Sequence, residues 1–274
     1  MNITPKNNSR EFNQFLFNYV NLDLYKYKFL RFYISSVKIR KQVLYDSSVL
    51  NIQETGWILI LHSDQLLVYG ENWTEKQFIE IASDFDFNNY KNFLVSGDSK
   101  LLHSLIRFNN LSNHQTEKER VFYKATKIKK IPLDNDVISL GKPNEINVLA
   151  LMLQEYYNQE YNGENNKKIE ETTRRVESLI NSEEIYVLKD SNGEIASFCT
   201  LINPDIGILF TKEQYRRQGK GKKLLSYCSS LLLKENDEIY LMTDKSVIAS
   251  NITCEKVCFT PFFDHTSIRI NSNK

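Results

Sequence analysis

The sequence predicts an α/β protein of the α+β type. A mixed central sheet flanked by helices is expected in the C-terminal half, and a second α+β domain in the N-terminal half. Three observations support this. A strand, a glycine-rich loop, a helix, a strand and a second helix follow one another between Ile206 and Lys256. An apolar hairpin pattern lies between Trp57 and Tyr69. The length of 274 residues exceeds the usual size of one domain, so two are expected.

The C-terminal elements are identified by their apolar patterns. Ile206–Thr211 is an apolar run of strand length, and Glu238–Thr243 is a second one. Between them, five residues recur at the spacing of one buried helical face: Leu224, Leu225, Cys228, Leu231 and Leu232. Ser246–Lys256 is expected to form a second helix that ends before Pro261. This order favours a parallel or mixed sheet with its ligand at the carboxyl end of the strand before the loop.

The loop between the first strand and the helix carries two glycines, Gly219 and Gly221, next to several basic residues. Glycines let a backbone approach a ligand closely, and the first turn of a helix offers unpaired N–H groups and a positive dipole end. The loop is therefore expected to bind an anion. It matches neither a Walker A loop, which ends in Gly-Lys-Ser/Thr, nor the Gly-x-Gly-x-x-Gly fingerprint of dinucleotide sites.

The run Arg216–Gly221 reads RRQGKG and has the spacing Arg-x-x-Gly-x-Gly. This spacing resembles the acyl-coenzyme A pyrophosphate loop of the GNAT superfamily of N-acetyltransferases. The resemblance continues through Asn251 and the phrase Cys254–Phe259, which reads CEKVCF where many members have Tyr-Glu-Lys-x-Gly-Phe. The stretch Ile206–Ile270 is similar to a bacterial subgroup of the superfamily with a longer N-terminal half.

The resemblance implies that the C-terminal half is a GNAT domain that uses acetyl-coenzyme A as co-substrate and no metal. It implies that main-chain groups of the strand hold the pantetheine arm, that loop amides and basic side chains hold the pyrophosphate, and that an amide side chain reaches the pantetheine from the last helix. In that order, the residues concerned are Leu209, Phe210 and Thr211; Arg216, Arg217, Gln218, Gly219, Lys220, Gly221 and Lys222; and Asn251. Fixed backbone donors suit this task because they stabilise phosphate and oxyanion charge without reorganising.

The sequence departs from the family pattern where the chemistry is expected. Cys254 stands where the family has a tyrosine that protonates the departing thiolate. A neutral thiol can donate a proton, but Cys is shorter than Tyr and its S–H is a poor hydrogen-bond donor. By its place in the pattern, Cys254 is the candidate proton donor. The alternative is that Cys254 is a small buried residue that packs the helix. Cys258 replaces the usual glycine, which is unfavourable by about 1 kcal/mol if the backbone there is left-handed.

No residue stands out as the general base. The segment Pro143–Tyr161 is expected to be the acceptor-binding helix, and it carries acidic and aromatic residues suited to a cationic amine. Glu155 is the candidate base within it. The other interpretation of this tyrosine-rich helix is a core and rim element without a substrate role.

Composition excludes several classes of protein. The chain has 35 basic and 34 acidic residues and no block of like charge, so binding to nucleic acid is disfavoured. The first ten residues lack an apolar signal-peptide core, and no run approaches the length of a membrane span. The four cysteines include no C-x-x-C pair, so neither a structural zinc site nor a disulfide framework is expected. A cytoplasmic protein without a membrane contact is predicted.

The N-terminal half has its own elements but no Arg-x-x-Gly-x-Gly run. Helices are expected at 12–20, 25–40, 74–82 and 99–108; strands are expected at 57–61, 66–69, 92–96 and 121–125; the polar run 111–120 is expected to be an exposed loop. Relative to the family, this half resembles a degenerate GNAT domain without a coenzyme site. The expected domains are residues 1–126 and 127–274. The first is expected to cover the acceptor side, to shape substrate choice or to supply a homodimer surface.

Two functions remain after these exclusions. The first is an acyl-coenzyme A dependent N-acetyltransferase, in which the primary amine of a small molecule or peptide attacks the thioester directly. The second is a non-catalytic acyl-coenzyme A binding or protein-interaction module derived from an acetyltransferase. The second is motivated by Cys254 and by the absence of an obvious base.

Overall fold

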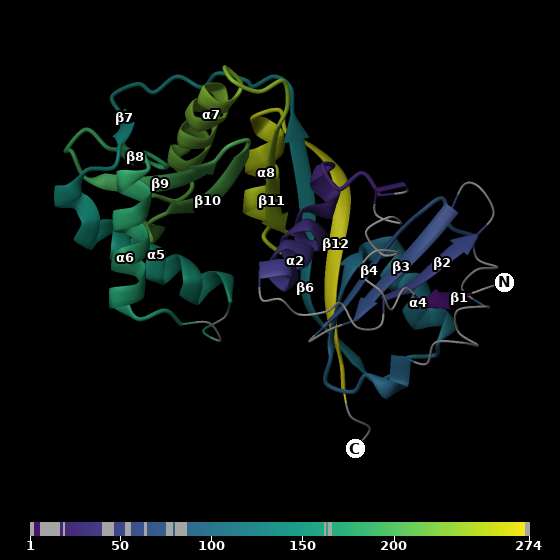
Figure 1. Cartoon of the computed structure of the whole chain (residues 1–274). Coiled ribbons are helices and arrows are strands. Elements are labelled where there is room, and N and C mark those ends of the chain that lie inside the picture. The colour runs from purple at the N-terminus through teal and green to yellow at the C-terminus, as the bar shows by residue number, and fades with distance from the viewer. Residues whose placement is uncertain are drawn as a thin grey trace. The chain divides into compact units, whose positions relative to one another are not determined.

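The computed structural model describes residues 3–5, 17–18, 20–39, 47–52, 56–62, 65–74, 79, 87–161, 163 and 166–271. The chain forms two compact units (Figure 1). Unit 1 comprises Met1–Phe122, Asp244–Ser246 and Phe263–Lys274, and unit 2 comprises Tyr123–Thr243 and Val247–Phe262. The two units are interleaved in sequence, so the segment 263–274, expected in the C-terminal domain, belongs to unit 1.

Unit 1 contains mixed strands in the order β1-β2-β3-β4-β5-β12-β6, of which β12 and β6 each have three residues assigned to unit 2. Neighbours from β1 to β4 are antiparallel, β4 and β5 are parallel, and β5 and β12 are antiparallel. The strands are β1 (Ile3–Pro5), β2 (Ser47–Ile52), β3 (Gly56–His62), β4 (Leu66–Glu71), β5 (Leu94–Asp98), β6 (His114–Ala125) and β12 (Thr260–Ile270). The helical segments are η1 (Tyr25–Tyr27), α2 (Lys28–Ile39), η2 (Phe87–Asn89) and α4 (Ser99–Phe108).

The sheet of unit 1 is covered by helices on both faces. Successive residues of a strand point to opposite faces. On β3, Leu59 packs with Tyr27 and Leu30 of η1 and α2. Its neighbour Ile58 packs with Leu101 of α4. The two apolar clusters therefore form a core on each side of the sheet.

Unit 2 contains the strands β7 (Val137–Leu140), β8 (Ile185–Lys189), β9 (Ile195–Ile202), β10 (Asp205–Thr211) and β11 (Ile239–Asp244). Their order is β11-β10-β9-β8-β7; β7 to β10 pair antiparallel, whereas β10 and β11 are parallel. The helical segments are η3 (Pro143–Glu145), α5 (Ile146–Glu160), α6 (Ile169–Asn181), η4 (Glu213–Tyr215), α7 (Lys220–Leu232) and α8 (Ile248–Lys256).

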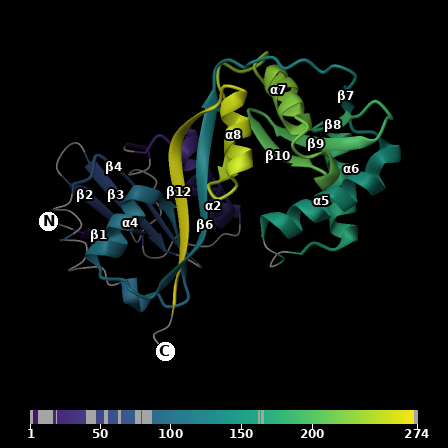
Figure 2. The same ribbon diagram turned by 180° about the vertical axis from the view of Figure 1, so that it is seen from behind.

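Helices also cover both faces of the sheet of unit 2. Phe198 of β9 packs in one apolar cluster with Leu153 of α5 and Val176 of α6. The next residue, Cys199, lies on the other face, where α7 with its buried Cys228 packs against β9. Figure 2 shows the same arrangement from behind, with β8 to β10 between α7 and the α5–α6 pair. The predicted mixed sheet flanked by helices is thus confirmed.

One predicted loop is wrong. The polar run 111–120 was expected to be exposed, but most of it belongs to β6, which extends from His114 to Ala125. Its charged side chains have partners on other segments: Glu117 pairs with Arg269 at 2.7 Å, and Lys118 pairs with Asp244 at 2.6 Å. Polar residues can form a strand when their side chains pair with neighbouring segments, and a hydrophobicity pattern does not reveal such a strand.

No helix in the described ranges combines the length and the apolar character that crossing a bilayer requires.

Candidate functional site

Strands β10 and β11 separate soon after they meet. Their parallel pairing includes a single residue pair, Asp205 with Tyr240, and the Tyr240 N–H donates to the Pro204 carbonyl at 3.3 Å. Beyond this pair, the edge of β10 that faces β11 has no strand partner in the described part of the chain. Apart from the Thr211 carbonyl, which accepts from the Arg216 guanidinium, the main-chain groups of residues 209–211 on that edge are therefore available to a ligand.

A β-bulge bends β10 where the two strands begin to separate. The register between β9 and β10 shifts between Ile206 and Leu209. Within the bulge, the Ile208 N–H donates to the Thr200 hydroxyl at 2.7 Å. A Cβ atom at Gly207 would lie 2.4 Å from the same hydroxyl oxygen, so only glycine fits without displacing it.

The loop after β10 presents a row of main-chain donors. Gly219 precedes α7 with a φ of 78°, and Arg217 has a φ of 62°. Before the row, the Arg216 N–H bonds to Glu213; after it, the Lys223 N–H bonds to Gly219. Within the described ranges, none of the six successive N–H groups of residues 217–222 donates a hydrogen bond to the protein. A Cβ at Gly219 would meet no atom within 4 Å, so the space beside Gly219 is open. The first turn of α7 therefore has the arrangement that binds phosphate groups.

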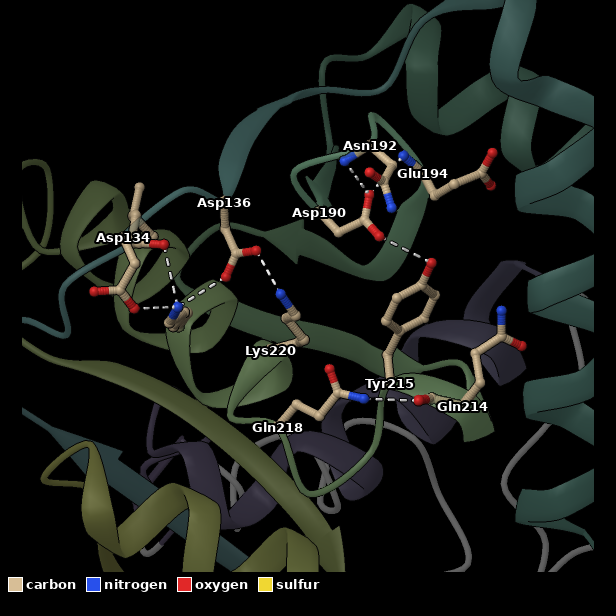
Figure 3. Close-up of polar contacts among 11 residues, drawn as sticks. Asp134, Asp136, Asp190, Asn192, Glu194, Gln214, Tyr215, Gln218 and Lys220 are labelled. Carbon is tan, nitrogen blue, oxygen red and sulfur yellow. Dashed lines mark hydrogen bonds and ion pairs between the residues drawn. The ribbon is translucent and has the colours of Figure 1, made fainter.

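Side chains hold the loop without using these donors. The Tyr215 hydroxyl donates to Asp190 at 3.1 Å, and the Gln218 side chain donates to the Gln214 carbonyl at 2.8 Å (Figure 3). Asp190 lies in the turn between β8 and β9, where it also accepts the N–H groups of Asn192 and Glu194. Both contacts fix the shape of the loop while its amides stay free.

The five basic residues of the loop differ in their partners. Lys220 pairs with Asp136 at 2.5 Å (Figure 3). Lys223 pairs with Asp134 at 2.7 Å and with Asp136 at 2.8 Å. The Arg216 guanidinium donates to the Gln159 side chain at 2.6 Å and to the Thr211 carbonyl at 3.1 Å. Two cations, Arg217 and Lys222, have no hydrogen bond or ion pair to any described residue. These two are the charges free to meet an anion at the amides.

Cys254 is in a position that suits packing more than proton transfer. Its side chain is 3% exposed, and burial raises the pKa of its thiol to about 12. The amide of Asn251, one turn earlier on α8, accepts hydrogen bonds from Tyr123 and Thr243 and donates to the Val247 carbonyl. The described contacts of Asn251 thus lie with β6, β11 and its own helix.

The candidate base Glu155 is connected to the loop through α5. The Gln159 side chain donates to Glu155 at 2.9 Å, and its carbonyl oxygen accepts from Arg216. On the same helix, the ring of Tyr156 lies 6.4 Å from that of Phe210 on β10. The structure therefore brings Glu155, Arg216 and the end of β10 into one neighbourhood. Cys254 has no described contact with this group.

The sequence interpretation missed three residues that shape the loop: Asp136, Asp190 and Tyr215. Asp136 lies directly before β7, in a segment for which no site residue was predicted. Asp190 begins a turn that reads DSNG, and this sequence is typical of a turn, so the turn could have been predicted. Asp190 and Tyr215 are 25 positions apart in the sequence, and no local pattern reveals a contact over that separation.

Within the described residues, no group of three His, Cys, Asp or Glu side chains is arranged to hold a metal ion.

Comparison with solved structures gives distant matches that cover most of the chain. A Drosophila protein solved by a structural genomics consortium has a TM-score of 0.57 at 10% identity over 99% of both chains. A GCN5-related N-acetyltransferase from Sphaerobacter thermophilus has a TM-score of 0.54 at 12% identity, over 82% of this chain and 84% of that one. A GNAT-family acetyltransferase from Colwellia psychrerythraea has a TM-score of 0.51 at 13% identity, over 81% and 84%.

Neither a protein-family model nor a curated protein matches the sequence. At 10 to 13% identity, the structural matches report on the fold and not on the reaction. The parallel strands that separate, the bulge before the loop and the helix after it lie in the segment whose sequence first suggested the family. The chain has the fold of the GNAT acetyltransferases.

Proposed function

We propose that this protein is an acyltransferase that moves an acetyl group from acetyl-coenzyme A to a primary amine. The observation that carries the proposal is the row of N–H groups at residues 217–222, which are free among the described residues and follow β10, the strand that pairs with β11 at one residue only. Such donors suit a pyrophosphate, and the free cations Arg217 and Lys222 add positive charge beside them. The unpaired edge of β10 offers main-chain partners to the amides of a pantetheine arm.

In the proposed reaction, the nitrogen of a neutral amine attacks the thioester carbonyl. The new C–N bond forms first and gives a tetrahedral oxyanion; when this collapses, the C–S bond breaks and its electron pair leaves on the coenzyme sulfur. A main-chain N–H at the end of β10 would stabilise the oxyanion that develops between these two events. Glu155 is the proposed acceptor of the amine proton, directly or through water. Because an alkyl thiol has a pKa near ~8.5, the coenzyme thiolate is a competent leaving group that can take its proton from solvent.

Binding of the coenzyme is tested by two substitutions at one position. Gly219→Trp and Gly219→Ala share the unfavourable left-handed backbone, but only tryptophan fills the open space beside the amides. We expect calorimetry with acetyl-coenzyme A to detect binding to the wild type and to Gly219→Ala, and none to Gly219→Trp. Equal binding by the wild type and both variants would place the coenzyme elsewhere and refute the proposed site.

A second candidate function is a non-catalytic acyl-coenzyme A binding module, favoured by the buried thiol of Cys254 where a family tyrosine is expected. A turnover assay separates the two functions. We expect release of free coenzyme A above background with at least one member of a panel of polyamines, amino acids, aminoglycosides and peptide N-termini. Binding of acetyl-coenzyme A without turnover of any member would favour the non-catalytic module.

A further inference from the structure

The segment between β6 and β7 runs along α7 in the opposite direction to the helix. The Ser226 hydroxyl donates to the Lys129 carbonyl at 2.8 Å and accepts the Ile131 N–H at 3.2 Å. Nearer the start of the helix, Lys223 donates to the Leu133 carbonyl at 3.1 Å. Lys220, the first residue of α7, reaches Asp136. The segment 129–136 is thus bound to the first two turns of α7 at successive points.

Asp136 makes the strongest of these contacts. Its side chain is 5% exposed, and each carboxylate oxygen accepts from a different ammonium, that of Lys220 at 2.5 Å and that of Lys223 at 2.8 Å. Burial by itself would raise the pKa of Asp136, but the hydrogen bonds from the two lysines outweigh it and hold the pKa below its ordinary value. Asp136 is therefore ionised at neutral pH. Asp134 differs from it, because its side chain is 71% exposed and it contacts Lys223 alone among the ammonium groups.

The first turn of α7 needs such a partner. Lysines at the N-terminus of a helix are unfavourable because the dipole there is positive, and here Lys220, Lys222 and Lys223 all lie in the first turn. Gly219 provides no side-chain cap for the helix. Without a carboxylate between them, Lys220 and Lys223 would repel each other and the helix end, and the first turn would open. The free amides of residues 220–222 belong to that turn.

We propose that Asp136 is a positioning residue for the coenzyme site: it holds the first turn of α7 closed by neutralising Lys220 and Lys223, so that the amides keep the direction needed to bind pyrophosphate. The inference rests on the proposed function. In this arrangement Lys220 serves the fold of the turn, and the anion is bound by the amides with Arg217 and Lys222.

The test compares Asp136→Asn with the matched control Asp134→Asn in the full chain. We expect Asp136→Asn to weaken binding of acetyl-coenzyme A about tenfold, since an opened turn loses preorganised donors, and Asp134→Asn to weaken it less than about twofold. If Lys220 were instead a phosphate ligand restrained by Asp136, the Asn variant would free it and bind the coenzyme more tightly. Tighter or unchanged binding by Asp136→Asn therefore overturns the inference while the proposed function stands.

A second measurement does not depend on the coenzyme. The N–H groups of residues 223–226 bond within the first turn, the Lys223 N–H to Gly219 at 3.0 Å. We expect Asp136→Asn to speed hydrogen exchange of these four amides and leave those of α5 unchanged, with no effect of Asp134→Asn. If Asp136→Asn does not fold, adding Lys220→Met removes the repulsion between the two ammonium groups and must restore folding; a double variant that also fails to fold overturns the inference. If the wild type binds no coenzyme, the proposed function fails, and unchanged exchange then refutes the role of Asp136 separately.

Discussion

Cys258 ends α8 in a conformation that glycine adopts more easily. Its φ is 77°, its N–H donates to the Glu255 carbonyl at 3.0 Å, and the Phe259 N–H donates to the Cys254 carbonyl at 3.1 Å. These two bonds form a Schellman motif, in which the residue with positive φ is usually glycine. The turn typical of the family is thus kept although a cysteine occupies it, and the strain stays in the backbone.

We expect Cys258→Gly to stabilise the protein. The change removes the strain of a left-handed cysteine and adds some backbone freedom to the unfolded chain, so the net gain is about 0.5 to 1 kcal/mol. Urea denaturation should show a higher midpoint for Cys258→Gly. Cys258→Ala, which also lacks the thiol but keeps a Cβ, should show none. A gain in the alanine variant would mean that the thiol and not the backbone is unfavourable.

A substitution of Cys254 tests whether catalysis needs a proton donor at the position where the family pattern has a tyrosine. Because burial raises the pKa of its thiol to about 12 and the side chain is nearly inaccessible, it is poorly suited to give a proton to a coenzyme thiolate. We expect Cys254→Ala to bind acetyl-coenzyme A as the wild type does and to lower turnover by less than the ~100-fold expected of an essential acid. Steady-state rates at saturating coenzyme provide the comparison. A larger loss would assign Cys254 a catalytic role.

His265 of β12 is buried without a hydrogen-bond partner for either ring nitrogen among the described residues. Its ring lies 4.7 Å from that of Phe29 and 6.0 Å from that of Phe122. Burial lowers its pKa to about 3, and the nearby Arg120 acts in the same direction. Between pH 6.5 and 3, the unfolded chain therefore binds a proton at this residue that the folded chain does not, and stability falls as the pH falls.

At pH 5 this single group is expected to reduce the free energy of unfolding by about 2 kcal/mol relative to pH 7.5. The variant His265→Phe keeps an aromatic ring and removes the titration. Melting temperatures at the two pH values should fall less for His265→Phe than for the wild type. An equal fall in both proteins would mean that other groups cause the loss of stability in acid.

At the scale of the element, patterns along the chain predicted the parts of the site that depend on local order. The strand expected at 206–211 is β10, the stripe of leucines is α7, and the helix expected at 246–256 is α8. The parts that patterns did not predict depend on distant partners. Strand β6 is polar where it pairs charges with other segments, and Asp136 meets α7 across 84 positions of sequence. A single sequence carries no periodic signal for such contacts.

The bulge in β10 provides an element-scale prediction. Gly207→Ala would place a Cβ 2.4 Å from the Thr200 hydroxyl oxygen, so that this hydroxyl must rotate and release the Ile208 N–H. Loss of the bond leaves a half-buried donor unpaired, and we expect a destabilisation of about 1 to 3 kcal/mol. Thermal unfolding measures it. Because β10 is the proposed pantetheine strand, affinity for acetyl-coenzyme A should fall as well.

Thr200→Ala separates the two effects of that change. It removes the same hydrogen bond but adds no atom beside Gly207. It should therefore destabilise the protein without changing the backbone shape of the bulge. We expect Thr200→Ala to keep more of the coenzyme affinity than Gly207→Ala does. If the two variants bind acetyl-coenzyme A equally well, the shape of the bulge does not contribute to binding.

At the scale of the whole molecule, each unit has one described pair of parallel strands, and the two pairs differ in how many residues they share. In unit 2, β10 and β11 share one residue pair, whereas in unit 1 β4 and β5 pair through Leu66, Leu67 and Val68. A Cβ at Gly97 of β5 would lie 1.8 Å from the Val68 carbonyl oxygen. The strands of unit 1 are therefore closed against each other at this point.

The end of β4 also carries an acidic side chain whose ion pair with Lys26 leaves no net positive charge for a phosphate. Glu71 accepts from Lys26 and from Tyr27, both at 2.5 Å. Burial by itself would raise the pKa of Glu71, but these hydrogen bonds outweigh it and keep the pKa below its ordinary value, so the carboxylate is ionised. No Arg-x-x-Gly-x-Gly run occurs in this half of the sequence. An ion pair without net positive charge thus lies at this strand end, whereas unit 2 has free amides in the loop after β10.

From this difference we expect one molecule of acetyl-coenzyme A to bind per chain. Calorimetric titration measures the stoichiometry, and Gly219→Trp should remove all of the heat and not half of it, because the only proposed site lies in unit 2. A stoichiometry of two, with half of the heat retained by Gly219→Trp, would assign a coenzyme site to unit 1. The closed pair of β4 and β5 would then have to open on binding, which faster hydrogen exchange at Val95–Gly97 in the presence of coenzyme would reveal.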